Sequence, residues 1–358
     1  MKVLAIVPYH IGFCAGQRFR IELWAKELAK RGIEVEFVCF SNKKLTDVLY
    51  QPGQYIKKAV MMVSAFTKQL FHVLTIQKPD LIFIYREAAL VGPAIIEKIV
   101  RRWDIPIVYD IDEPLFVPYV SPSNGVLNKL KFFSKIDTIM AMSDTIFSVN
   151  QSIKNHADGF NKQVNIVPMT VDLDRYAPSI NTINKASKPI ITWVGTVTNQ
   201  PNIDLIVPAL RDVKKTHDFE FKIIADVDMA IDGLDINFIP WAYDIEVPHL
   251  QSAMIGLVPV KDTIWSPYKF FFKTVQYMGL GMPVVASAVG SNTEIIQDGE
   301  NGFLAKSDAE WTEKITILLD NPALRASMGK KARQTAVAHF DIKKQYDFVE
   351  SVFRSAIN

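Results

Sequence analysis

Short apolar runs alternate with longer amphipathic segments along the whole chain. The runs are five to seven residues long and are rich in valine and isoleucine on both faces, which is typical of strands buried in a parallel sheet. They predict strands at 3–8, 35–40, 81–86, 105–110, 138–143, 164–169, 190–195, 221–226, 236–241, 254–260 and 283–287. The amphipathic segments predict helices at 17–31, 55–77, 88–102, 124–134, 144–156 and 323–357.

Strands that alternate with helices predict the α/β class, with two doubly wound parallel sheets. The chain has 358 residues, more than one hydrophobic core usually supports, so two domains are expected. A polar stretch flanked by prolines separates the two halves and is typical of a linker. We expect a first domain at 1–172, a linker at 173–188, a second domain at 189–340 and a final helix at 341–358.

One predicted helix, which follows the loop after the 254–260 strand, carries the strongest chemical signal. Ser266 and Pro267 favour its start, and Gly281 favours its end. Large apolar residues cover most of its circumference, so the helix is expected to be mostly buried.

The polar positions of this predicted helix gather on one side. Lys269, Lys273 and Gln276 lie within about 60° of one another on a helical wheel. The two lysines stand near the helix start, where the helix dipole disfavours cations. They therefore indicate a phosphate or another anion nearby. The alternative is a narrow stripe through which the lysines reach water.

Other candidate residues follow predicted strands, where sheets of this kind bind ligands. Gly195 and Thr196 follow the first strand of the second half, and a glycine there lets the backbone approach a ligand or makes a tight turn. Gly16 follows the first strand of the chain, with Arg18 and Arg20 just after it. These arginines either face a ligand cleft or pair with Glu22.

Acidic residues follow a strand of the first half. Asp110, Asp112 and Glu113 either contact acceptor hydroxyls or cap the next helix. Arg86 follows the preceding strand, where it contacts a ligand or forms a structural pair with Glu87. No metal site is expected at these positions, because no histidine supports one.

Composition narrows the class of protein. The chain is 49% hydrophobic and 22% charged, which is ordinary for a globular enzyme, and its net charge of +2 argues against a nucleic-acid partner. Two cysteines are too few for a disulfide scaffold and suggest a reduced, cytoplasmic protein. Two basic amphipathic segments, at 57–74 and 127–135, either pack on their sheet or lie on an anionic membrane surface.

Four segments together resemble the retaining glycosyltransferases of family 4, which have the GT-B fold. The most specific is KFFFKTVQYMGLGMPVVASAVGSNTEIIQDGENGFLA (269–305), and 16–38, 166–176 and 324–340 support it. The resemblance implies two Rossmann-like domains that face each other across a cleft, with the C-terminal helix returning to the first domain. It also implies a donor site in the second domain and an acceptor site in the first.

The resemblance assigns roles to particular positions. Lys269 and Lys273 would lie near the donor phosphates and stabilise charge there during catalysis. The family usually has two glutamates eight residues apart, where this chain has Tyr268 and Gln276, of which Gln276 can still bind a ribose hydroxyl. Trp241 stands where the family's nucleobase pocket begins, and the alternative role for it is packing. The loop after the 283–287 strand would supply Ser291, Asn292 and Thr293 to the donor site.

The function implied is transfer of a sugar, with retention of configuration, from a nucleotide-diphosphate sugar to a saccharide or lipid-linked saccharide. This implies no cofactor and no metal, and a role in bacterial cell-surface polysaccharide or glycolipid assembly. The protein would be cytoplasmic or peripheral on the inner face of the plasma membrane. The alternatives are a non-catalytic nucleotide-sugar-binding protein and a nucleotide-sugar epimerase.

Overall fold

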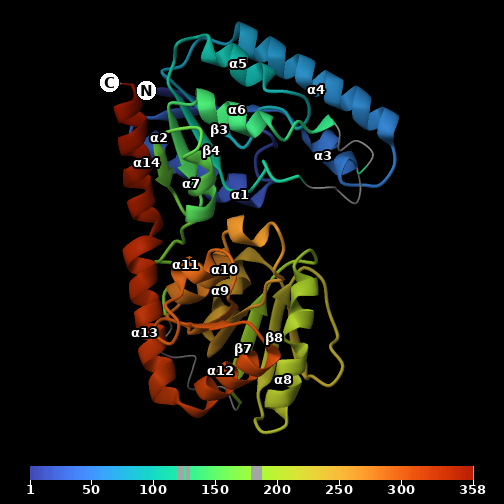
Figure 1. The fold of residues 1–358 in the computed structure, drawn as a ribbon, viewed down its shortest axis with the longest axis vertical. Coiled ribbons are helices and arrows are strands. Elements are labelled where there is room, and N and C mark those ends of the chain that lie inside the picture. The colour runs from blue at the N-terminus through green and yellow to red at the C-terminus, as the bar shows by residue number, and fades with distance from the viewer. Residues whose placement is uncertain (119–124, 126–129, 179–187, 358) are drawn as a thin grey trace. The chain divides into compact units, whose positions relative to one another are not determined.

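The computed structural model describes residues 1–118, 125, 130–178 and 188–357. The chain divides into two compact units. Unit 1 comprises Met1–Met169 and Gln345–Asn358, and unit 2 comprises Thr170–Lys344 (Figure 1). Each unit is built on a six-stranded parallel sheet, which confirms the predicted α/β class with two doubly wound sheets. Most of the expected linker, 179–187, lies outside the described residues, whereas Leu173 and Tyr176 are buried in unit 2.

Unit 1 has the strand order β2-β1-β3-β4-β5-β6. Its strands are β1 Lys2–Val7, β2 Glu34–Cys39, β3 Leu81–Tyr85, β4 Ile107–Ile111, β5 Thr145–Ser148 and β6 Val164–Ile166. Its helices are α1 Ala15–Gln17, α2 Leu23–Lys30, α3 Lys43–Leu49, α4 Tyr55–Thr75, α5 Ile95–Arg101, α6 Lys135–Met142 and α7 Gln151–Ala157, with a π-helical turn at Arg18–Glu22.

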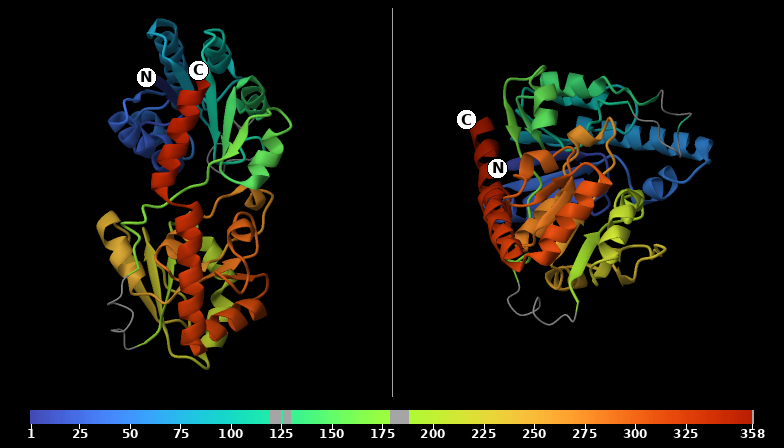
Figure 2. Two further views of the ribbon diagram at one scale, coloured as in Figure 1. Left: turned by 90° about the vertical axis from the view of Figure 1, so that its left-hand side faces the viewer. Right: turned by 60° about the horizontal axis from the view of Figure 1, so that its bottom comes forward.

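The last helix of the chain, α14 Ile342–Ala356, helps to close the core of unit 1. Its buried Val349 and Phe353 pack with Trp24 of α2 against alternate residues of the sheet, including Phe83. Figures 1 and 2 show α14 and α4 on opposite sides of unit 1.

Unit 2 has the strand order β12-β11-β10-β7-β8-β9. Its strands are β7 Ile190–Val194, β8 Glu220–Ala225, β9 Ile236–Pro240, β10 Ile255–Val258, β11 Val284–Ser287 and β12 Phe303–Ala305. Its helices are α8 Val207–Lys214, α9 Tyr243–Gln251, α10 Phe272–Gly279, α11 Asn292–Ile295, α12 Asp308–Asp320 and α13 Pro322–His339, with 3₁₀ turns at Gln200–Leu205 and Ser266–Tyr268. One face of the sheet is covered by α8 and α12, and the other by α9, α10 and α13.

Several predicted elements differ from the structure. The apolar run 138–143 is not a strand but lies in α6, and β5 occupies part of the predicted 144–156 helix. The predicted helix 323–357 is divided into α13 and α14 around Phe340–Asp341. A sixth strand of unit 2, β12, was not predicted, since it has only three residues. Much of the predicted helix 124–134 lies outside the described residues.

Candidate functional site

The strand order of unit 2 places a topological switch point between β7 and β10. Successive strands are added in opposite directions from these two neighbours, so the loops after them diverge and leave room for a ligand at their carboxyl ends. The two loop regions are tied together by one hydrogen bond, which the Lys261 backbone N–H donates to Asn202 Oδ1 over 3.0 Å. The loop that follows β10 leads into the first turn of α10, so the start of this helix lies next in the chain after the switch point.

Lys273, in the first turn of α10, is a half-buried cation. Its Nζ lies 4.8 Å from the centroid of the Trp193 ring, on β7. Within the part of the chain that the structure describes, no carboxylate or carbonyl accepts a hydrogen bond from this ammonium group. Burial lowers the pKa of Lys273 to about 8. A desolvated ammonium group without an anionic partner is unfavourable, and a bound anion would relieve that cost.

Lys269 does not share a helical face with Lys273, so this part of the sequence interpretation was wrong. The predicted helix is interrupted, and Lys269 is an exposed residue with extended backbone (φ −82°, ψ 138°). A tertiary hydrogen bond explains the interruption, because Ser291 Oγ accepts from the Phe271 N–H over 2.8 Å. This bond holds the chain before α10 against the loop that follows β11, and α10 begins only at Phe272.

The loop after β11 supports the start of α10. Asn292 Oδ1 accepts from the Thr274 hydroxyl over 2.7 Å, and the Asn292 amide donates to the Ser287 carbonyl. Asn292 and Ser291 are fully buried, whereas Thr293 is exposed and donates to the Gly290 carbonyl. Ser291 and Asn292 therefore position Lys273 through α10, and Thr293 is the member of this predicted set that solvent reaches.

Gln276 points into the core of unit 2. Its amide donates to the Tyr176 hydroxyl over 2.7 Å and to Glu246 Oε1 over 3.2 Å. The Glu246 carboxylate is itself buried and also accepts from Tyr176. The Gln276 amide is thus used inside the protein, which binds α10 to α9 and to the chain that enters unit 2.

Gly195 follows β7 because nothing larger fits beside the Trp193 ring. A Cβ atom at this position would lie 2.1 Å from that ring. The neighbouring Thr196 is exposed and forms a hydrogen bond with the Thr198 hydroxyl over 2.8 Å. Trp241, directly after β9, is 43% exposed, so its indole is open to a ligand rather than enclosed in the core.

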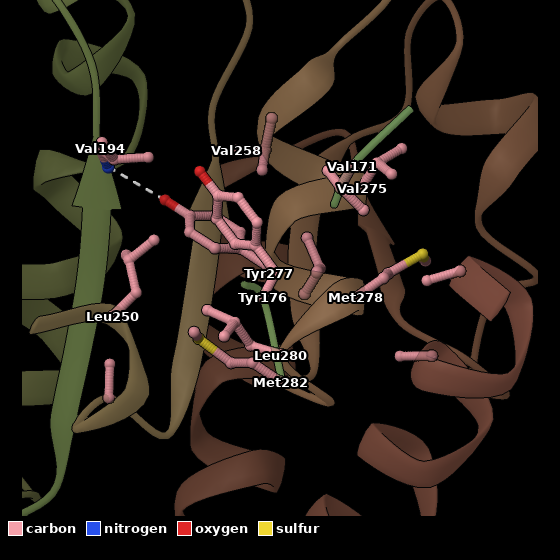
Figure 3. Close-up of a cluster of buried hydrophobic side chains, with 14 of the residues drawn as sticks. Val171, Tyr176, Val194, Leu250, Val258, Val275, Tyr277, Met278, Leu280 and Met282 are labelled. Atoms are coloured by element: carbon pink, nitrogen blue, oxygen red, sulfur yellow. Dashed lines mark hydrogen bonds between the residues drawn. The ribbon is translucent and has the colours of Figure 1, made fainter. Parts of the chain in front are cut away.

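Two aromatic residues that the sequence interpretation missed shape this region. Trp193 lies under Lys273. Tyr277 accepts a hydrogen bond from the Val194 N–H over 2.9 Å, which fixes α10 to β7 (Figure 3). The Tyr277 ring also fills the space over Gly256 of β10. Their sequence signal was that of ordinary core residues, because an aromatic residue in a strand or an apolar helix is most often part of a core.

In unit 1 the corresponding switch point lies between β1 and β3. Arg86, directly after β3, has a left-handed backbone with φ 59°, which is rare for a residue with a side chain. Its Nε and Nη2 donate to both oxygens of Asp112, over 2.6 and 3.0 Å, and its Nη1 lies 3.2 Å from Glu113. The Tyr85 hydroxyl also donates to Asp112.

Of the predicted acceptor contacts, Asp112 is enclosed and Glu113 is open. Burial acts to raise the pKa of Asp112, but the Arg86 guanidinium outweighs it and holds this pKa below its ordinary range. Glu113 keeps 43% of its side chain exposed. The expected pairing of Arg86 with Glu87 was wrong, since Glu87 instead pairs with Lys135 over 2.6 Å.

Arg20 and Asp110 form a fully buried ion pair. Arg20 Nε and Nη2 donate to the two Asp110 oxygens over 2.7 and 2.6 Å, and Nη1 donates to the Val167 carbonyl. Neither side chain is exposed, so a structural role replaces the predicted acceptor contact for both. Arg18 is exposed, and the structure has no ion pair between Arg18 and Glu22 among its described residues.

Gly16 is buried against the Arg86 cluster. A Cβ atom at this position would lie 2.1 Å from Asp112 Oδ2 and 2.4 Å from the Tyr85 hydroxyl oxygen. Beside it stands an aromatic group that sequence reasoning missed, in which the Phe13 ring lies near those of Tyr9 and Tyr50 and the two tyrosine hydroxyls are 2.9 Å apart. Phe13 and Tyr50 are exposed.

Comparison with known proteins shows which proteins the second half of the chain, and parts of the rest, are similar to. Residues 188–321 match the family described as Glycosyl transferases group 1. An uncharacterised glycosyltransferase of Methanocaldococcus jannaschii is 25% identical over 239 residues, which cover 62% of this chain and 64% of that protein. Trehalose synthase of Pyrococcus horikoshii is 36% identical over 130 residues, which cover 36% of this chain and 28% of that protein. The chain thus spans less than two thirds of the length of both relatives.

Solved structures share the fold over almost the whole chain. Sucrose-phosphate synthase of Thermosynechococcus elongatus superposes with a TM-score of 0.72 at 14% identity, covering 99% of both chains. HepE of Anabaena, in complex with UDP-glucose, superposes with a TM-score of 0.71 at 15% identity, covering 99% of this chain and 100% of HepE. The sequence match and the fold agree: residues 188–321 are similar to the Glycosyl transferases group 1 family, within a chain that has the two-sheet fold of GT-B glycosyltransferases.

Proposed function

We propose that the protein transfers a sugar, with retention of configuration, from a nucleotide-diphosphate sugar bound by unit 2 to an acceptor hydroxyl. The observation that carries this proposal is the Lys273 ammonium group, which is half-buried at the switch point and has no anionic partner among the described residues. A donor diphosphate supplies the missing negative charge. The Anabaena neighbour that binds UDP-glucose supports a donor of this class.

The donor residues differ in what they can contribute. Lys273 is the main phosphate contact, and the exposed Lys269 adds a second positive charge. The exposed Thr196, Thr293 and Trp241 are available to the phosphates, the sugar and the base. Gln276 reaches the ribose only if it exchanges its bond to Tyr176 for one to the ligand.

The reaction depends on the leaving group. As the bond between the sugar and the diphosphate breaks, negative charge grows on the phosphate oxygen, and Lys273 stabilises it. The leaving oxygen then accepts the proton of the acceptor hydroxyl on the same face of the sugar, so the new bond keeps the original configuration. No divalent cation takes part in this proposal.

The acceptor is proposed to bind unit 1, at the carboxyl ends of β1 and β3. The exposed Glu113 and Arg18 offer hydrogen bonds to hydroxyls, and Arg86 fixes Glu113 in place. The exposed ring of Phe13 offers a stacking surface for a sugar. We propose a saccharide or lipid-linked saccharide as acceptor, in bacterial cell-surface assembly on the cytoplasmic side of the membrane.

Calorimetry with UDP, GDP and dTDP tests the donor site. The change Lys273→Ala should raise the Kd of the preferred diphosphate at least tenfold, since it removes a charged hydrogen bond. Lys330→Ala, at an exposed lysine of α13, is the matched control and should leave the Kd unchanged. Equal affinities of wild type and Lys273→Ala would overturn the proposal. The anomeric configuration of the product, followed by NMR, tests retention.

A non-catalytic nucleotide-sugar-binding protein is the second candidate. It is favoured by Gln276, a neutral amide that is bonded internally where the family resemblance implies a carboxylate. Such a protein would bind the nucleotide through Lys273 but would neither transfer nor hydrolyse the sugar. Release of the nucleoside diphosphate from the nucleotide sugar distinguishes the two candidates, since only the enzyme would produce it. The assay uses membrane extract as acceptor and EDTA to remove divalent cations.

A further inference from the structure

Helix α4 carries a stripe of large apolar side chains that face solvent. Ile56, Val60, Val63, Phe71 and Leu74 are each 63% to 84% exposed. At about 100° per residue, their positions fall within roughly 80° of the helix circumference. The stripe therefore runs along one side of a helix of 21 residues, which is about 31 Å long.

The opposite side of α4 already has its packing partners. Met61, Met62 and Phe66 pack in a hydrophobic cluster with Phe40 and Leu90, and α4 runs beside α5 (Figure 1). The stripe is consequently not the core-facing side of the helix. Scattered exposed apolar residues are ordinary in proteins, but five large apolar residues aligned on one face of a helix, with the exposed Thr67 between Val63 and Phe71, mark an interaction surface.

The surroundings of the stripe are strongly basic. Residues 43–78 contain six lysines, at 43, 44, 57, 58, 68 and 78, against a single acidic residue, Asp47. This local charge of +5 contrasts with +2 for the whole chain. Lys58 is buried and donates to the Gln51 carbonyl, so the other five lysines carry the surface charge. Lys57 and Lys68 are exposed and follow one flank of the stripe, and α4 itself contains no acidic residue.

We propose that this face of α4 docks on the surface of an anionic lipid bilayer. The apolar stripe would enter the boundary between headgroups and acyl chains, while Lys57 and Lys68 contact lipid phosphates. No helix in the described part of the chain is long and apolar enough to cross a membrane, so α4 lies in the surface plane. The inference extends the proposed lipid-linked acceptor by naming the surface that holds the protein at the bilayer.

A lipid surface fits this face better than a protein partner. Interfaces between proteins concentrate their energy in a central group of tryptophan, tyrosine and arginine residues. The stripe is instead mainly aliphatic and extends over the length of α4, with Lys57 and Lys68 on one flank and no acidic residue within the helix. The Glu36 carboxylate approaches α4 at His72, which lies on the opposite side of the helix from the stripe. This distribution has no central group of residues. Its apolar row and flanking lysines match the apolar interior and the anionic headgroups of a bilayer.

Co-sedimentation of the full chain with vesicles tests the proposal. We expect binding to vesicles of phosphatidylglycerol and phosphatidylcholine, weak binding to phosphatidylcholine alone, and weaker binding at high salt. Val63→Glu should lower the partition coefficient on the order of tenfold or more, because it places a charge in the apolar layer. Val337→Glu makes the same change at an exposed valine of α13 and should have little effect.

Charge is tested separately from apolar burial. Lys68→Glu should weaken binding to anionic vesicles about tenfold, whereas Lys330→Glu should not. Calorimetry with UDP on the same variants separates this inference from the donor site, since loss of vesicle binding with unchanged UDP affinity supports it. Equal vesicle binding by wild type and Val63→Glu overturns it. The proposal is also overturned if the wild type is a dimer that does not bind vesicles and if Val63→Glu dissociates it. That result would show that the stripe is a protein interface.

Discussion

Arg20 and Lys273 are both shielded from solvent, but they differ in whether an anionic side chain neutralises their charge. Arg20 is completely enclosed, but it shares two hydrogen bonds with Asp110, 90 residues further along the chain. Lys273 has an aromatic ring beside it and no carboxylate among the described residues. The sequence offers the same signal for both, a basic residue among apolar ones near a predicted ligand loop. Whether a distant residue neutralises the charge depends on tertiary packing, which explains why Arg20 has a structural role and Lys273 remains a candidate for the donor site.

The pKa of Lys273 predicts how nucleotide binding depends on pH. In the free protein this pKa is about 8, and a bound diphosphate would raise it. Above pH 8 the neutral Lys273 amine must therefore take up a proton as the diphosphate binds, so the Kd for UDP should rise with pH, by up to tenfold per unit. Calorimetry between pH 7 and 9.5 measures this, in a range where the phosphate of UDP is already ionised.

Lys273→Met provides the control and a second readout. Its weaker UDP binding should lose the dependence on pH above 7. Because the pKa of Lys273 is lower in the folded protein than its ordinary value of 10.5, the unfolded chain binds more protons between pH 8 and 10.5. Below pH 8 the variant should therefore be more stable than wild type, on the order of 1–3 kcal/mol. A variant that is both less stable and still sensitive to pH would contradict this account.

At the scale of elements, the long buried strands were predictable and the local breaks were not. Runs such as 81–86 and 190–195 are apolar on both faces and became β3 and β7. The run 138–143 has the same apolar character but contains Met140, Ala141 and Met142, and these good helix formers placed it in α6. The predicted start of α10 at Ser266 failed because Ser291, 20 residues away, bonds the Phe271 N–H and delays the helix.

The attachment of α10 to β7 is expected to depend on one hydroxyl group. Tyr277→Phe removes the acceptor of the Val194 N–H and leaves that buried group unpaired. The free energy of unfolding should fall by about 1–3 kcal/mol. Urea denaturation followed by tryptophan fluorescence measures it, and Tyr243→Phe, at a residue 61% exposed, is the control. Equal transition midpoints for the two variants would show that water satisfies Val194.

At the scale of the molecule, two units of similar construction carry separate parts of the proposed reaction. The alternation of strands and helices was enough to predict two sheets. The alternation alone could not predict the boundary of unit 1, because Gln345–Asn358 returns to a core made mainly by the first 169 residues. The expectation that the C-terminal helix returns to the first domain came from the family resemblance. A helix with one apolar face has no mark that tells which of two sheets it will cover.

Phe353→Ala should reveal the two units as separate cooperative structures. Phe353 is fully buried in unit 1, with its ring centroid 5.8 Å from that of Phe83, so its loss should cost unit 1 about 3–5 kcal/mol. Scanning calorimetry should show one transition at a lower temperature, while the UDP affinity proposed for unit 2 is retained. Phe348→Ala, on the same helix but 38% exposed, should shift the transition much less. If the whole unfolding profile shifts to a lower temperature by the same amount, the chain unfolds as one cooperative body.

The membership of α14 in unit 1 has a consequence for how the chain is made. Domains usually fold in the order in which the ribosome releases them. Here the first sheet must wait, with Trp24 and Phe83 incompletely covered, until Val349 and Phe353 have emerged. Unit 2 can complete its own core earlier, since all its residues, up to Lys344, are released before the missing helix of its predecessor. The half synthesised second is therefore the half that can mature first, and the nascent protein would be able to hold a nucleotide before its other half is closed.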